Sequence, residues 1–150
     1  MDKKELVAEW LRFAFMDFDN AKYLFETRHP APLEIICYHC QQSAEKYLKG
    51  VIIAFGEEPE KTHDLSKLLN VLQNFTELPA NFRQIALKLT QFGVRVRYPD
   101  EIPVDESQTK TAIAHAEKIK QWAESDIAKI EEEEKKAEEE KSSEQENSKK

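Results

Sequence analysis

The chain has 150 residues, a net charge of −7 and only three glycines. This length is typical of one domain, and scarce glycine beside abundant leucine, alanine, glutamate and lysine favours an all-α fold. No apolar run reaches membrane-spanning length, so we expect a cytoplasmic protein without a membrane partner. The acidic balance argues against a nucleic-acid partner unless a local basic pocket exists.

Two long helices are predicted in the first third of the chain. The first runs from about Lys3 to Thr27, with apolar residues at spacings of three and four that Asp17 interrupts. After the break "RHPAP", the second is expected over about Leu33 to Phe55, with Gly56 as its C-terminal cap. These patterns predict an amphipathic helix pair.

The two cysteines, Cys37 and Cys40, lie within the second predicted helix as "CYHC". This spacing indicates redox chemistry in a βαβ unit, but here both thiols fall near one apolar face. No second cysteine pair completes a zinc site. We therefore interpret them as buried small hydrophobic residues and expect no metal.

The third predicted helix is short and follows "THDL", where Thr62 or Asp64 provides an N-terminal cap. The fourth begins near Ala80, and Pro99 stops it at or before Tyr98. Both are expected to bury an apolar stripe.

A fifth helix is predicted after "DESQ", where Asp105 and Gln108 have the spacing of a capping box. Its apolar stripe ends at Ile130, and residues 131–150 are dominated by Glu, Lys and Ser. We expect them to form a charged tail that is frayed or disordered, with a solvated helix over its first turns as the alternative. Residues 1–130 are then predicted to form an antiparallel up-and-down bundle of four long helices plus one short helix.

A row of polar residues lies on a second face of the second predicted helix. The row consists of Tyr38, Gln42, Glu45, Lys46 and Lys49. An exposed i, i+4 pair explains Glu45 and Lys49 for about 0.3 to 0.5 kcal/mol, but it does not explain Tyr38 and Gln42. The row is therefore a candidate ligand-binding surface.

His63 is the residue of "THDL" that capping leaves unexplained. It is a candidate for proton transfer or for a phosphate contact, with a surface histidine as the alternative. The remaining histidines stand without partners at ligand spacing and are interpreted as structural: His29, His39 and His115.

The stretch "VRVRYPD" places Arg95, Arg97, Tyr98 and Asp100 at the end of the fourth predicted helix. Cations suit a helix C-terminus, which is the structural alternative. Arginine is also the preferred partner of phosphate and carboxylate groups, and both arginines can reach one ligand if the helix unwinds before Pro99. We favour a ligand or partner site.

The ordered set "YHCQQSAEKYLKG", "THDL" and "VRYPD" resembles the HEPN family, over about Lys3 to Ile130. The residues that match the family motifs are Gln42, Glu45, Lys46, Lys49, His63, Asp64, Arg97, Tyr98, Pro99 and Asp100. The resemblance implies a bundle that pairs as a homodimer, with polar residues of the second and fourth helices near a shared cleft.

The resemblance also implies possible partners. Many prokaryotic members act with a minimal nucleotidyltransferase, in several cases as a toxin–antitoxin pair. The leading hypothesis is a non-catalytic homodimer that binds a nucleotide or such a nucleotidyltransferase through Arg97, Lys49 and Tyr98. No cofactor is required on this interpretation.

One branch of the family consists of metal-independent ribonucleases with an arginine and a histidine separated by four to six residues. Neither Arg95 nor Arg97 has a histidine at that spacing, so the expected general acid/base is missing. A divergent ribonuclease using Arg97 with His63, and a purely structural dimer with Arg97 buried against Glu45 or Asp100, remain the alternatives.

Apolar residues outside the main stripes indicate a second buried surface. These are Phe15, Phe18 and Ile53. We expect them to contribute to the homodimer interface.

Overall fold

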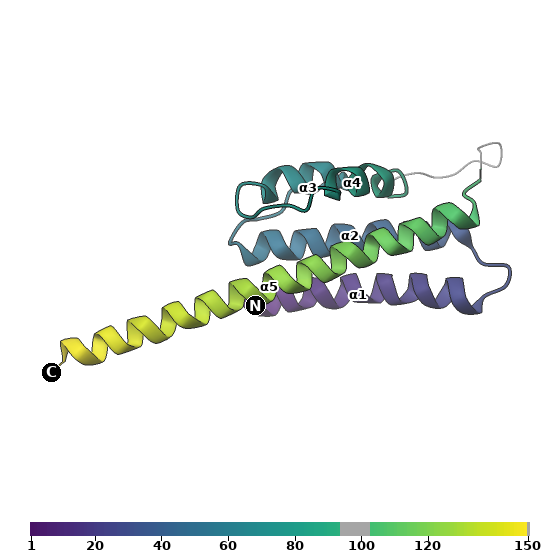
Figure 1. Cartoon of the computed structure of the whole chain (residues 1–150). Helices are drawn as coiled ribbons and strands as arrows, with labels where there is room; N and C mark the ends of the chain where they lie inside the picture. The colour runs from purple at the N-terminus through teal and green to yellow at the C-terminus, as the bar shows by residue number, and fades with distance from the viewer. Residues whose placement is uncertain (94–102, 150) are drawn as a thin grey trace.

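The computed structural model describes residues 1–93 and 103–149, and these residues form α-helices without any strand (Figure 1). The helices are α1 (Lys3–Thr27), α2 (Leu33–Ala54), α3 (Leu65–Leu72), α4 (Phe82–Thr90) and α5 (Glu106–Ser148). None of the described helices combines the length and hydropathy that a membrane crossing requires. The predicted all-α bundle is confirmed.

Helix α2 is the centre of the bundle. It contacts the other four helices, and Figure 1 shows α1 on one side of it and α3 and α4 on the other. Tyr47, Leu48 and Ile52 of α2 are almost completely buried. Because α2 has neighbours on several sides, it has little solvent-exposed surface on which polar residues could lie, and polar side chains on it must find partners inside the protein.

Local signals set most helix starts. Asp2 accepts a hydrogen bond from the Glu5 amide at 2.8 Å, and Asp64 accepts one from the Ser66 amide at 2.9 Å. The capping box predicted at the start of α5 is present, since the Asp105 side chain accepts from the Gln108 amide at 2.7 Å. These caps satisfy amide groups that the first helical turn leaves unpaired.

Helix α4 is shorter than expected, so the described bundle has three long helices and two short ones. It has nine residues and ends at Thr90, which lies within the predicted limit of Tyr98 or earlier. The next residues form tight turns, in which the amides of Phe92 and Gly93 bond to carbonyls three residues earlier. The buried side chain of Gln41 packs on Gly93. Residues 94–102 lie outside the described part of the chain.

The charged residues beyond Ile130 are helical. Residues 131–148 continue α5 as an exposed helix, and Figure 1 shows it extending beyond the rest of the bundle. Glutamate and lysine are strong helix formers, and they repeat here at i, i+4 spacing. Lys3 forms an ion pair with Glu134, which joins the base of this extension to α1.

Candidate functional site

A buried carboxylate on α2 organises a polar cluster within the bundle. One oxygen of Glu45, Oε1, accepts from Gln41 Nε2 at 3.2 Å and lies 2.8 Å from His63 Nδ1. The other, Oε2, accepts from Lys49 Nζ at 3.1 Å. We name Gln41, Glu45, Lys49 and His63 the Glu45 cluster. Gln41, Glu45 and Lys49 are buried, whereas the His63 side chain is 53% exposed.

The backbone brings these four residues together in two ways. Gln41, Glu45 and Lys49 recur every four residues and so share one face of α2. His63 comes from the turn before α3, and its carbonyl accepts a hydrogen bond from Gln41 Nε2 at 2.9 Å. Because the Glu45 carboxylate can only accept a hydrogen bond, His63 Nδ1 carries a proton and donates it to Glu45. The other ring nitrogen, Nε2, is then the atom of His63 that can contact a ligand.

Gly93 packs directly on this cluster. A Cβ atom added to Gly93 would lie 2.4 Å from Cδ of Gln41, a side chain that is completely buried. Gln42 also donates to Gln41 Oε1 at 2.7 Å. Gly93, the last residue described before residues 94–102, therefore lies against the Glu45 cluster. The next residues in the sequence are those of "VRVRYPD".

A second polar cluster links α1 to α2. Asp17 pairs with Lys46 through Oδ2 and lies 2.9 Å from His39 Nδ1 through Oδ1. Burial opposes ionisation of Asp17, but the hydrogen bonds and charges of His39 and Lys46 outweigh it and hold the pKa of Asp17 below its ordinary value. His39 was interpreted from the sequence as a structural histidine without a partner at ligand spacing, and its partner Asp17 comes from another helix.

The structure thus divides the predicted row on α2. Glu45, Lys49 and His63 come together with Gln42 beside them, whereas Lys46 belongs to the Asp17 cluster. Tyr38 is exposed and contacts the His39 ring edge-on, at 6.0 Å between ring centroids.

Of the other predicted site residues, Asp64 acts as the N-cap of α3. The predicted site residues Arg95, Arg97, Tyr98 and Asp100 lie outside the described residues, and their roles stay predictions.

Sequence reasoning missed Gln41, Gly93, Asp17 and His39 as site residues. Gln41 could have been predicted, because it precedes Glu45 by four residues, just as Lys49 follows Glu45 by four. Asp17 was noticed only as an interruption of an apolar stripe. Its partners, and the contact of Gly93 with Gln41, carry no signal in local spacing.

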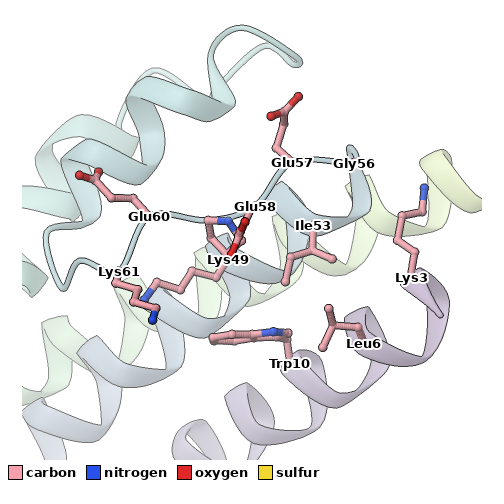
Figure 2. A pocket seen from close by; sticks show the side chains of 11 residues that line it. Lys3, Leu6, Trp10, Lys49, Ile53, Gly56, Glu57, Glu58, Glu60 and Lys61 are labelled. Atoms are coloured by element: carbon pink, nitrogen blue, oxygen red, sulfur yellow. The ribbon is translucent and has the colours of Figure 1, made fainter. Parts of the chain in front are cut away.

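A pocket of about 650 Å³ adjoins the Glu45 cluster through Lys49 (Figure 2). Lys49 Nζ lies 5.9 Å from the centroid of the Trp10 ring. We name this cavity the Trp10 pocket; it is lined by Lys3, Leu6, Trp10, Lys49, Ile53 and residues 56–61. Its volume is in the range of small-molecule sites.

Metal binding finds no support in the described residues. In that part of the chain, no group of three or more His, Cys, Asp or Glu side chains is placed to hold a metal ion. Cys37 and Cys40 are both buried, and Cys37 Sγ donates to Thr109 Oγ1 at 3.5 Å. Burial raises the pKa of Cys40, with a further contribution from Cys37, which keeps the thiol protonated and unreactive.

Comparisons with known proteins agree with the motifs. The family model described as "HEPN domain" matches residues 7–127. TT1696 from Thermus thermophilus superposes with a TM-score of 0.70 at 24% identity, over 80% of this chain and 97% of that one. ST0689, an archaeal HEPN homologue, gives 0.63 at 27% identity, over 81% and 97%. No curated protein matches the sequence.

A third structure, the HEPN domain protein tm0613 from Thermotoga maritima, has a TM-score of 0.53 at 24% identity, over 83% of this chain and 95% of that one. At such identities, the likeness to the two bacterial structures establishes the fold alone. The family assignment rests on the sequence match.

Proposed function

Because this chain belongs to the HEPN domain family, we propose that it is a non-catalytic, homodimeric, cytoplasmic module that binds a nucleotide. We further propose a minimal nucleotidyltransferase as its protein partner, with the two forming a toxin–antitoxin pair. The observation that supports nucleotide binding is the Glu45 cluster, which places Lys49 beside a pocket and His63 at the surface.

The cluster has a composition suited to recognising an anion. Lys49 is held by Glu45, so its ammonium is fixed in place before a ligand arrives. His63 is oriented through Nδ1, and in the imidazolium form its Nε2 also carries a proton and can donate it to a phosphate oxygen. Arg97 completes the proposed site, by its place in the sequence just after Gly93.

The test is equilibrium dialysis with radiolabelled ribonucleoside triphosphates at fixed salt. A hydrogen bond to a charged group contributes about 1.5 to 3 kcal/mol, so we expect Arg97→Ala to weaken binding by about 10- to 150-fold. Lys49→Met combined with Glu45→Gln, which removes both buried charges, should weaken it similarly. Lys110→Met, on an exposed pair, is the control. Equal binding by wild type and Arg97→Ala would remove Arg97 from the site.

The homodimer proposal rests on exposed apolar side chains of α1 and of the start of α2. Of the residues first expected at the interface, Phe18 and Ile53 are buried within one chain, and only Phe15 is exposed. Other exposed apolar residues are better candidates: Phe13, Met16, Tyr23, Ile35 and Tyr38. Phe13, Met16 and Tyr23 lie at spacings of three and seven, which gives α1 a second apolar face.

Light scattering on gel-filtered protein tests this surface. Phe13→Asp should convert a dimer into a monomer, because a charge would be buried at the interface. Leu87→Asp is the matched control, since Leu87 is an exposed apolar residue on α4. A wild-type monomer at micromolar concentration, or a dimer unaffected by Phe13→Asp, would contradict the proposal.

One observation favours the ribonuclease as a second candidate. Glu45 and His63 form a carboxylate–imidazole pair at 2.8 Å, the arrangement that orients a histidine for proton transfer. Metal-free cleavage of RNA that is lost in His63→Ala would establish it. Intact RNA after long incubation at several pH values would exclude the ribonuclease and leave nucleotide binding as the proposed function.

A further inference from the structure

The Trp10 pocket has two chemically different walls. Leu6 and Trp10 of α1, with Ile53 of α2, provide an apolar floor, and Figure 2 shows the indole edge-on beneath the loop of residues 56–61. Lys49 and Lys61 bring ammonium groups to the same cavity. A flat apolar surface beside cations matches an aromatic ring that carries an anionic group.

We propose that the Trp10 pocket is the base subsite of the nucleotide site, with the base stacked on Trp10 and the phosphates held by Lys49 and Lys61. This inference rests on the proposed function. It assigns a binding surface to the base, the part of the nucleotide for which the family motifs offer no partner. Trp10 belongs to none of those motifs.

The charges around the pocket are compatible with an anion at Lys61. Lys61 pairs with no carboxylate in the part of the chain that the structure describes. Figure 2 shows the carboxylates of Glu57 and Glu60 turned away from the indole. Glu58 is the acidic rim residue that opposes a phosphate, so Glu58→Gln should strengthen binding.

The stacking itself can be measured on a single tryptophan. The chain has two, and Trp122 packs edge-on against Phe82 at 5.3 Å between ring centroids, with neither residue among those lining the pocket. In Trp122→Phe, the remaining emission comes from Trp10. We expect the four ribonucleoside triphosphates and adenosine to quench it, and ribose 5-phosphate to leave it unchanged. In Trp10→Phe, the emission of Trp122 should not respond.

Affinities separate the two halves of the subsite. Base stacking contributes the equivalent of about 5- to 150-fold in affinity, so Trp10→Leu should weaken triphosphate binding in dialysis at least fivefold, and Trp10→Phe should retain most of it. Lys61→Gln should weaken triphosphate binding but leave adenosine binding unchanged.

The outcomes distinguish this inference from the function on which it rests. If triphosphates bind the wild type but Trp10→Leu binds equally well and Trp10 emission does not change, the base lies elsewhere and nucleotide binding stands. Equal quenching by ribose 5-phosphate would also overturn the stacking. If no triphosphate binds the wild type, the proposed function fails and the subsite fails with it.

Discussion

Replacing Lys49 with methionine would leave the Glu45 carboxylate buried without its ammonium partner. The two side chains are 9% and 6% exposed, so solvent can screen the lost charge only weakly. Removing one partner of a buried ion pair costs about 3 to 5 kcal/mol. Glu45 keeps two hydrogen-bonding contacts, to Gln41 Nε2 at 3.2 Å and to His63 Nδ1 at 2.8 Å, so we expect the lower end of this range, about 3 kcal/mol.

A second substitution tests whether the cost arises from the unpaired charge. Glu45→Gln retains an oxygen that can accept from Gln41 and His63 but removes the negative charge. The double variant Lys49→Met/Glu45→Gln should therefore be more stable than Lys49→Met alone, because no uncompensated charge remains buried.

Urea denaturation followed by far-UV circular dichroism measures these free energies of unfolding. The matched control is Lys110→Met on the Glu106–Lys110 pair, which has the same spacing and order but side chains 70% and 64% exposed. It should change the free energy of unfolding by about 0.5 kcal/mol or less. A double variant no more stable than Lys49→Met, or a control as costly as Lys49→Met, would refute the reasoning.

Three further predictions concern other parts of the chain. Gly93→Ala should destabilise the folded state by about 1 to 3 kcal/mol, because the added Cβ would lie 2.4 Å from Gln41 Cδ. In Gly50→Ala the added Cβ meets only contacts at 3.6 Å, so this variant should be neutral or stabilising by up to about 1 kcal/mol. Similar urea midpoints for the two variants would contradict this. Asp17→Asn should be less stable than wild type at pH 7. The difference in stability should close as the pH falls from the ordinary carboxyl pKa of 3.8 through the lowered pKa of Asp17 in the folded state. A depressed carboxyl pKa contributes stability that is complete above the unfolded-state pKa and is lost as the pH falls through the folded-state pKa. A difference independent of pH would be inconsistent with the Asp17 cluster. Truncation after Ile130 should reduce the helical signal but change the free energy of unfolding by about 0.5 kcal/mol or less, since residues 131–148 are exposed, and a loss above about 1 kcal/mol would show that they pack on the bundle.

Short-range signals predicted the helix ends well. The first helix was placed at about Lys3–Thr27 and the third after a cap at Thr62 or Asp64, because capping and apolar spacing act within a few residues. The fourth helix was expected to be long but has nine residues. Just after its end, Gly93 packs on Gln41, a contact that joins segments about fifty residues apart in sequence.

The candidate site shows the same division. The spacing of Glu45 and Lys49 indicated a pair, but an exposed pair and a buried one have identical spacing, and only the packing around α2 makes this one buried. Lys46, three residues from Lys49, was expected at the same site. The position of α1 against α2 directs it instead to Asp17.

By itself, the sequence determined an all-α bundle, its caps and the family motifs, because helical periodicity and capping depend on neighbouring residues. Tertiary structure alone decided which polar residues meet. The pairing of Glu45 with His63 and of Asp17 with His39 depends on how separate helices and loops pack, and this geometry has no counterpart in linear spacing.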